Sequence, residues 1–199
     1  MSVRDYSAYI FDLDGTLVTI PVDWTKVRED LGKIAGAQIG DGPIFLKVEQ
    51  LIALRPSLRD TVFEMIDRHE LEALGVAFPM EGAFELLSHL SKEAKLGLVT
   101  MQGAAACDRV LNKQRIAEFF DEIVTREDSL DRTIQLRAAG RTLGAPLQET
   151  LFTGDRMNDV ICGKRAGMRT VLVGKEPNSE AQPDFVFANI SMLKDALAF

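Results

Sequence analysis

The sequence predicts an α/β protein with a doubly wound, mainly parallel sheet and a small inserted α-helical cap. Short apolar runs that end in polar or glycine residues are typical of buried parallel strands, and amphipathic segments of helix length lie between most of them. This alternation favours a layered α/β sheet with right-handed crossovers. The stretch 18–78 interrupts the alternation and has a helical pattern, which indicates an insertion after the first strand.

The expected strands are short and apolar, and the expected core helices carry apolar side chains on one face. The strands are Tyr9–Phe11, Leu96–Thr100, Glu122–Thr125, Leu151–Thr153 and Thr170–Val173, with a weaker pattern at Phe185–Phe187. The helices between them are Gly82–Lys92, Ala104–Gln114 and Ile134–Leu143. Because parallel strands end at one edge of a sheet, we expect any ligand site along that edge.

The inserted stretch is expected to form a helical bundle that folds over the end of the first strand. Its helices are Trp24–Ala35, Ile44–Ala53 and Leu58–Leu74, and Ser57 and Asp60 are residue types that favour the start of the last one. We therefore expect a core domain of residues 1–17 and 79–199 and a cap domain of residues 18–78.

The composition is typical of a soluble globular protein with a substantial core. Of the 199 residues, 46% are hydrophobic and 27% are charged, and the formal net charge of -7 argues against nucleic acid or an anionic membrane as the main partner. Cys107 and Cys162 form no metal-type cluster, which fits a reducing compartment. No signal peptide or membrane-length apolar run is visible, so we expect a cytoplasmic protein.

Two carboxylates follow the first expected strand, in the run Asp12-Leu13-Asp14-Gly15-Thr16. The period of a strand puts Asp12 and Asp14 on one side, which is costly unless a cation lies between them or one of them keeps a proton. Metal binding and proton transfer therefore both fit this pair. The alternative interpretation is an acidic turn, since Asp-Gly is a common turn dipeptide.

A second acidic cluster and a threonine follow two further expected strands. Asp155 and Asp159 lie in the run Gly154-Asp155-Arg156-Met157-Asn158-Asp159. Mg²⁺ prefers oxygen ligands, and Asp12 with Asp155, a backbone carbonyl and waters would satisfy it. The alternative is a pair of acids favoured by a helix dipole. Thr100 ends its strand with a hydroxyl, next to backbone N–H groups that could hold a phosphate oxygen.

Together these residues resemble the haloacid dehalogenase (HAD) superfamily, most closely its phosphoglycolate-phosphatase-like branch. Asp12–Thr16 matches the first family motif, DxDGT, Thr100 matches the second, and Gly154–Asp159 matches the fourth, GDxxxD. The helical insertion lies where this branch carries its cap. The resemblance implies a HAD-type Rossmann-like core.

The resemblance also implies phosphoryl transfer through an aspartyl-phosphate. In that chemistry Asp12 attacks phosphorus, and Asp14 protonates the leaving group and later activates water. Mg²⁺ is held by Asp12, the Asp14 carbonyl and Asp155, with Asp159 nearby and able to act through water. Contacts to the substrate are expected from Gly15, Thr16, Thr100, Met101 and Gln102.

The sequence departs from the family pattern at two places. The third family motif is a Lys, and the corresponding stretch 125–133 contains none. Arg132 is the best substitute by position, at the start of an expected helix, although Arg and Lys are not equivalent and a solvated surface Arg is the alternative. Met101 stands where many relatives have Asn, and the backbone N–H groups of Met101 and Gln102 are expected to compensate.

These observations favour a Mg²⁺-dependent phosphatase that acts on a small phosphorylated metabolite, with the cap selecting the substrate. One alternative is a phosphomutase of the β-phosphoglucomutase type. Another is a non-catalytic HAD-like protein that binds a partner through its cap groove. Arg28, Arg55 and Arg59 of the cap are candidates to face the site, with a solvated surface as the simpler interpretation. The sequence does not specify the physiological substrate or the oligomeric state.

Overall fold

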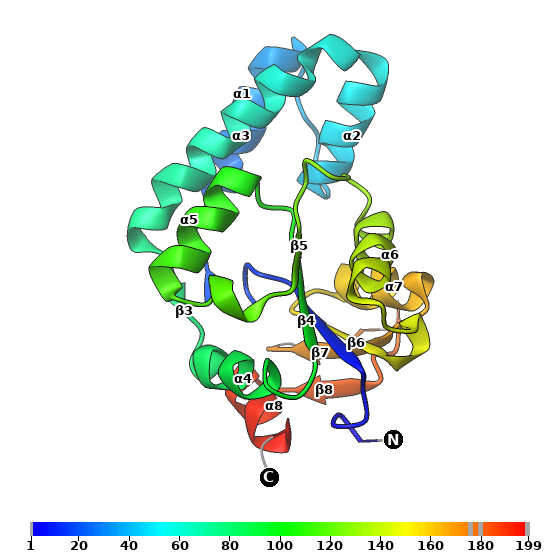
Figure 1. Cartoon of the computed structure of the whole chain (residues 1–199). Coiled ribbons are helices and arrows are strands. Elements are labelled where there is room, and N and C mark those ends of the chain that lie inside the picture. The colour runs from blue at the N-terminus through cyan, green and yellow to red at the C-terminus, as the bar shows by residue number, and fades with distance from the viewer. Residues whose placement is uncertain (1, 175–176, 179–180, 198–199) are drawn as a thin grey trace.

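A six-stranded, all-parallel sheet forms the centre of the protein, in the order β5-β4-β1-β6-β7-β8 (Figure 1). The structure is a computed structural model that describes residues 2–174, 177–178 and 181–197. The strands are β1 (Ala8–Phe11), β4 (Lys95–Val99), β5 (Glu122–Val124), β6 (Thr150–Gly154), β7 (Arg169–Val173) and β8 (Phe185–Phe187). The expected strands and the doubly wound fold class are confirmed.

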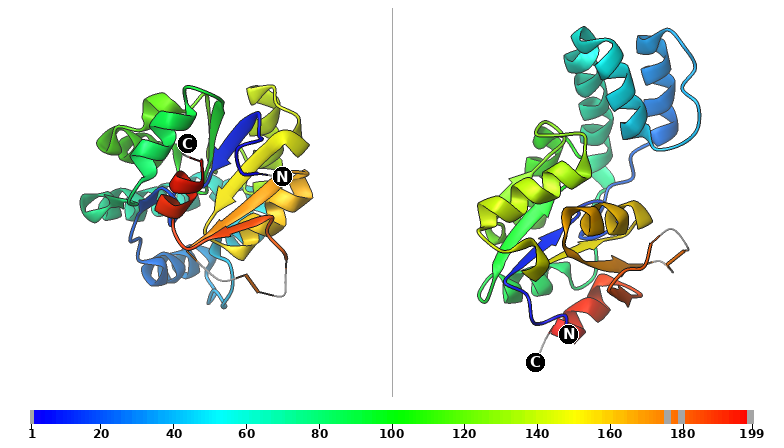
Figure 2. Two further views of the ribbon diagram at one scale, coloured as in Figure 1. Left: turned by 90° about the horizontal axis from the view of Figure 1, so that it is seen from below. Right: turned by 90° about the vertical axis from the view of Figure 1, so that its right-hand side faces the viewer.

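Helices cover both faces of this sheet (Figure 2). The helices on one face are α6 (Arg132–Leu143) and α7 (Met157–Ala166), and those on the other are α4 (Ala83–Leu90), α5 (Ala104–Gln114) and α8 (Ile190–Leu197). The alternation of side chains along β1 explains the two layers, because Ala8 and Ile10 pack with α6 and α7 whereas Tyr9 and Phe11 pack on the opposite side. In the described part of the chain, no helix combines the length and apolar character needed to cross a membrane.

The cap lies above the sheet and consists of helices (Figures 1 and 2). They are α1 (Trp24–Ala35), α2 (Ile44–Leu54) and α3 (Arg59–Ala73), with short 3₁₀ helices η1 (Pro56–Leu58) and η2 (Leu74–Val76) on either side of α3. Neither Ser57 nor Asp60 caps α3 through its side chain, because the chain enters α3 from η1 with Leu58 at the cap position. Asp60 lies instead in the first turn.

A two-stranded stem joins the cap to the core, a feature that the sequence pattern did not predict. Strand β2 (Val18–Thr19) pairs antiparallel with β3 (Phe78–Pro79), and the Met80 N–H donates to the Leu17 carbonyl at 2.9 Å. The chain therefore leaves and re-enters the core at adjacent points. The expected domain limits, 18 and 78, fall inside this stem.

Candidate active site

Three neighbouring strands end in the residues that the sequence singled out. Thr100, Asp12 and Asp155 follow β4, β1 and β6, which are adjacent in the sheet. The Asp12 N–H continues the ladder by donating to the Thr153 carbonyl at 2.9 Å. As a result, the carboxylates of Asp12, Asp155 and Asp159 are buried with one ligand oxygen each within 4.8 Å of the others.

Two glycines make this crowding possible. Gly15 has a φ of +83°, and a Cβ added there would lie 2.7 Å from the carboxylate of Asp155. A Cβ on Gly154 would lie 2.5 Å from the Asp159 side chain. Any larger residue at either position would push the acids apart, so glycine here serves the packing of the carboxylates as well as the turn.

Arg132 is a buried partner of this carboxylate cluster. Its side chain is only 11% exposed, and its Nη1 donates to Asp12 Oδ1 at 2.7 Å and to the Val99 carbonyl at 2.9 Å. The same nitrogen lies 3.6 Å from Asp159 Oδ1. Arg132 is therefore not a solvated surface residue. It supplies a fixed positive charge beside Asp12.

The start of α6 explains how Arg132 reaches Asp12. The carboxylate of Asp131 accepts hydrogen bonds from the N–H groups of Thr133 and Ile134 at 2.7 and 3.2 Å. This side-chain cap sets the first residue of the helix at Arg132.

Burial and the charge of neighbouring carboxylates raise the pKa values of Asp12 and Asp159. Burial is the largest cause at Asp159, whose pKa rises to about 7, and the charges of Asp12 and Asp155 add to it while Arg132 opposes it. The pKa of Asp12 is also raised by burial, against the opposing effect of Arg132. A buried, all-oxygen cluster with more negative than positive charge fits a hard divalent cation, which would stabilise the ionised form of each acid.

Asp14 lies beside the cluster and has separate contacts. Its Oδ1 accepts a hydrogen bond from the Ile20 N–H at 2.8 Å, just after strand β2 of the stem. Burial raises the pKa of Asp14 to about 6, and the hydrogen bond from Ile20 opposes the rise. The two carboxylates of the first acidic run therefore have different partners: Arg132 for Asp12 and the stem for Asp14.

The loop after β4 holds three of the residues that were expected to contact the substrate: Thr100, Met101 and Gln102. Thr100 is buried, and its Oγ1 accepts a hydrogen bond from the Gln102 N–H at 3.1 Å, so that amide is engaged within the loop. The Met101 carbonyl accepts from Arg126 Nη1 at 3.1 Å. Thr16 is fully buried, and its hydroxyl has no hydrogen-bond partner among the described residues.

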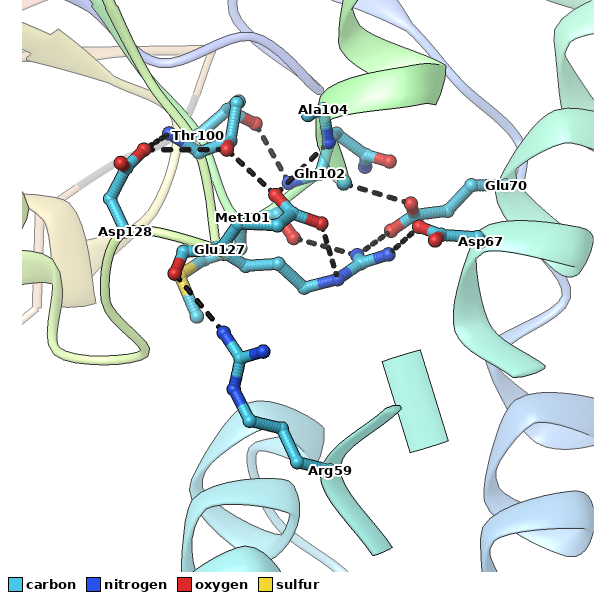
Figure 3. Close-up of polar contacts among 12 residues, drawn as sticks. Arg59, Asp67, Glu70, Thr100, Met101, Gln102, Ala104, Glu127 and Asp128 are labelled. Carbon is cyan, nitrogen blue, oxygen red and sulfur yellow. Dashed lines mark hydrogen bonds and ion pairs between the residues drawn. The ribbon is translucent and has the colours of Figure 1, made fainter. Parts of the chain in front are cut away.

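The cap arginines have different roles from one another. Arg28 donates to the carbonyls of Gly40 and Gly42 at 2.6 and 2.9 Å, and Arg55 donates to the Ala35 carbonyl at 2.8 Å. These two side chains therefore brace loops within the cap. Arg59 instead reaches the core and donates to the Glu127 carbonyl at 3.2 Å (Figure 3).

Arg126 is a buried residue that the sequence analysis did not single out. It follows β5, its side chain is 0% exposed, and it forms ion pairs with Asp67 and Glu70 of cap helix α3; Figure 3 labels these two acids on the helix. The run Thr125-Arg126-Glu127-Asp128 looks like a solvated charged loop in the sequence. Only the packing of the cap against this loop distinguishes Arg126 from a surface arginine.

Comparison with known proteins places the chain in a family. A family model described as haloacid dehalogenase-like hydrolase matches residues 46–173. The pyrophosphatase PpaX of Bacillus cereus is 28% identical over an alignment 212 positions long, gaps included, which covers 95% of this chain and 95% of PpaX. PpaX of Halalkalibacterium halodurans is 26% identical over an alignment of 214 positions, with 96% of each chain covered.

Solved structures share the fold over nearly the whole chain. A haloacid dehalogenase-like family hydrolase from Streptococcus pneumoniae matches with a TM-score of 0.71 at 17% identity, covering 98% of this chain and 99% of its own. The HAD-hydrolase YfnB of Bacillus subtilis, solved with bound magnesium, matches with a TM-score of 0.66 at 17% identity, with 98% and 99% covered. The resemblance drawn from the motifs is confirmed: the family model spans more than half of the chain, which belongs to the haloacid dehalogenase-like hydrolases.

Proposed function

We propose that the protein is a Mg²⁺-dependent phosphatase that hydrolyses a small phosphorylated metabolite through an aspartyl-phosphate on Asp12. One observation carries the proposal: Asp12 is buried at the end of β1, ion-paired with Arg132, and close to both Asp155 and Asp159. A carboxylate held in this way is oriented for attack, and the Arg132 guanidinium together with a cation held by the acids would offset the charge of a phosphate.

In the proposed reaction, a carboxylate oxygen of Asp12 forms a bond to phosphorus, and the bond from phosphorus to the leaving oxygen breaks. Asp14 gives its proton to that oxygen. The carboxylate of Asp14 then takes a proton from a water molecule as the water oxygen attacks phosphorus, which releases phosphate and restores Asp12. Arg132 holds Asp12 Oδ1, and this contact would fix the orientation of the carboxylate through both steps.

Asp14 suits the role of acid and base because burial raises its pKa to about 6. A group with such a pKa exists in both protonation states near neutral pH, which general acid–base catalysis requires. The hydrogen bond from the Ile20 N–H holds the Asp14 carboxylate in a fixed position next to the stem.

The metal would be held by the side chains of Asp12, Asp155 and Asp159 together with the Asp14 carbonyl. Bound there, Mg²⁺ would offset repulsion between the carboxylates and the phosphate and stabilise charge in the transition state. The raised pKa values of Asp12 and Asp159 support this assignment. The bound magnesium in YfnB, whose fold is similar, also supports it.

Inorganic pyrophosphate is a second candidate substrate. The PpaX pyrophosphatases match 95% of this chain, so the similarity includes the cap as well as the core. The proposed chemistry at Asp12 is the same for a phosphate monoester and for pyrophosphate, because both present a terminal phosphoryl group.

A substrate panel tests the proposal directly. Purified protein would be assayed for phosphate release from phosphorylated metabolites, an aryl phosphate and pyrophosphate, with Mg²⁺ and with EDTA. We expect Mg²⁺-dependent turnover that Asp12→Asn lowers at least about a thousandfold. Asp108→Asn, on the outer side of α5, is the matched control and should retain turnover.

Three outcomes would contradict the proposal. Turnover that survives in Asp12→Asn would exclude Asp12 as the nucleophile. A product analysis in which the phosphoryl group passes to a hexose phosphate rather than to water would favour the phosphomutase alternative. The absence of metal-dependent turnover over the whole panel would favour a non-catalytic binding protein.

A further inference from the structure

A polar cluster joins cap helix α3 to the core loops that follow β4 and β5. We call it the junction cluster and define it as Asp67, Glu70, Gly103, Arg126 and Glu127; Figure 3 labels Asp67, Glu70 and Glu127. The side chains of Arg126 and Glu70 are both 0% exposed. The guanidinium of Arg126 donates through Nη1 to Glu70 Oε1 at 2.6 Å and through Nη2 to Asp67 Oδ1.

The same cluster holds the loop that follows Thr100. Arg126 Nη1 donates to the Met101 carbonyl at 3.1 Å, and Glu70 Oε2 accepts from the Gly103 N–H at 3.0 Å. The Arg126 N–H donates to the Gln102 carbonyl at 3.4 Å. Successive residues of the loop 101–103 therefore each bond to Glu70 or Arg126.

The packing of this region leaves little freedom. A Cβ on Gly103 would meet the Asp67 carboxylate and lie 2.5 Å from Arg126 Nη2, so the loop backbone lies directly against the ion pairs. Glu127 accepts from the Ala104 N–H at 3.0 Å, and its side chain lies 3.9 Å from Arg126 Nε. Two carboxylates thus accept hydrogen bonds from the N–H groups of Gly103 and Ala104 at the start of α5 and fix the end of the loop there.

Stability alone does not account for such a cluster. Burying a guanidinium and a carboxylate costs desolvation free energy, and apolar side chains of similar size often stabilise a fold as well or better. What the charged cluster provides is a fixed geometry, because a planar guanidinium that bonds two carboxylates and a carbonyl tolerates little displacement.

Resting on the proposed function, we propose that Arg126 and Glu70 are positioning residues that couple the cap to the phosphate-binding loop 100–103. Helix α3 and the loop move together because both are bonded to the same two side chains. A phosphate bound at Thr100 stabilises the junction cluster, and an intact cluster raises the affinity of the loop for phosphate by the same factor.

The experiment measures this coupling with inorganic phosphate as the probe, in the presence of Mg²⁺. Amide hydrogen exchange would be followed in α3 and in residues 100–104, and the affinity for phosphate would be measured by calorimetry. In the parent protein we expect phosphate to slow exchange in α3 as well as in the loop, although α3 belongs to the cap.

Three variants and one control separate positioning from stability. Glu70→Gln keeps an oxygen acceptor for the Gly103 N–H but removes the negative charge. Arg126→Lys keeps the positive charge but loses the planar guanidinium that bonds both carboxylates. Arg126→Met combined with Glu70→Met removes the buried ion pair with little change in side-chain volume. We expect phosphate affinity to fall about tenfold in the double variant and less in the single ones. His69→Gln is the control, because His69 lies in α3 but pairs with Asp30 inside the cap at 3.0 Å.

The double variant decides between the two roles. If it binds phosphate as tightly as the parent, or if phosphate still slows exchange in α3 as it does in the parent, the cluster has only a structural role and the inference is overturned. Protein that binds phosphate and shows the coupling but releases none from any substrate would overturn the proposed function alone. Turnover without coupling in the parent would overturn this inference alone.

Discussion

The contacts of Arg132 show how one residue can take the place of the lysine that the family pattern leads us to expect. Its guanidinium bonds both a carboxylate, on Asp12, and a carbonyl, on Val99, and it lies 3.6 Å from Asp159 Oδ1. A lysine ammonium is a point charge on a flexible stem, whereas a guanidinium is planar and stays protonated in proteins. Arg132 therefore adds orientation as well as charge at Asp12.

Arg132→Met should separate metal binding from turnover. Loss of the positive charge leaves Asp12 and Asp159 without their neutralising partner, so Mg²⁺ should bind roughly tenfold more tightly. Turnover should nevertheless fall about a hundredfold, because Asp12 loses its orienting contact. Calorimetric titration with Mg²⁺ and steady-state kinetics would measure the two effects.

Arg137→Met provides the comparison for this variant, since Arg137 lies on the same helix and donates to the Arg165 carbonyl at 2.6 Å. The affinity for Mg²⁺ and the turnover should both stay at the parent level in Arg137→Met. Unchanged turnover in Arg132→Met would exclude the role assigned to Arg132.

The acidic residues of the site could be predicted from the sequence, whereas Arg126 could not. Asp12 and Asp155 each lie at the end of a short apolar run typical of a buried strand, and parallel strands bring such ends together. Arg126 also follows a strand, but its neighbours are charged and its partners on α3 are far away in the sequence. No local pattern in the sequence predicts the ion pair between Arg126 and Glu70.

At the level of single elements, the start of α6 determines where the positive charge of the site lies. Asp131 caps the helix through two backbone N–H groups and makes Arg132 the first helical residue. Fraying of this turn would move the guanidinium away from Asp12.

Asp131→Ala should lower both stability and turnover. The loss of the cap is expected to cost about 1 kcal/mol of the free energy of unfolding. Turnover should fall because Arg132 is no longer held, and urea unfolding together with steady-state kinetics would measure both. Asp23→Ala is the matched control, because Asp23 caps α1 by accepting from the Lys26 N–H at 3.1 Å and lies in the cap. It should lose similar stability and keep its turnover; equal losses of turnover in the two variants would contradict the account.

The core strands and the helices could be predicted from their apolar patterns, whereas the two-residue strands of the stem could not. The strand at Tyr9–Phe11 and the helix Trp24–Ala35 agree with the structure to within a residue, because each buries a complete face. The stem strands Val18–Thr19 and Phe78–Pro79 are too short to show a period, and a proline in β3 argues against a strand. Their pairing depends on the return of the chain from the cap, which brings together two segments that are far apart in the sequence.

For the molecule as a whole, the junction cluster brings acidic side chains of the cap into contact with a buried arginine of the core. One guanidinium faces the carboxylates of Asp67, Glu70 and Glu127. Burial is the main cause that raises the pKa values of Asp67 and Glu70, and Arg126 opposes the rise at both.

Arg126→Met should therefore make the stability of the protein more dependent on pH. Without the guanidinium, the pKa of buried Glu70 rises further above its value in the unfolded chain, and the charge of Asp67 adds to the rise. The folded variant then binds a proton more tightly than the unfolded one, so its deficit is largest at high pH and shrinks as the pH falls. We expect a loss of about 3 kcal/mol at pH 8 and a clearly smaller loss at pH 5.

Urea unfolding of parent and variant at both pH values would measure this difference. The double variant with Glu70→Met lacks the buried carboxylate and should show much less of the added pH dependence. A deficit in Arg126→Met that is the same at both pH values would mean that Glu70 is not buried against Arg126 in solution.

The paired stem has a consequence for how such a chain can change over time. Thr19 and Phe78 are partners in an antiparallel pair, whose Cα atoms lie about 5 Å apart, and a turn of two residues can join strands at that spacing. The entropic cost of closing a loop grows only slowly with its length. Insertions of many sizes can therefore be placed between the two stem strands without disturbing the sheet. A core in which a two-residue turn replaces the cap would keep Asp12 and Arg132. Arg126 would lose its ion pair with Glu70 and would leave a positive charge without that partner beside the loop after Thr100.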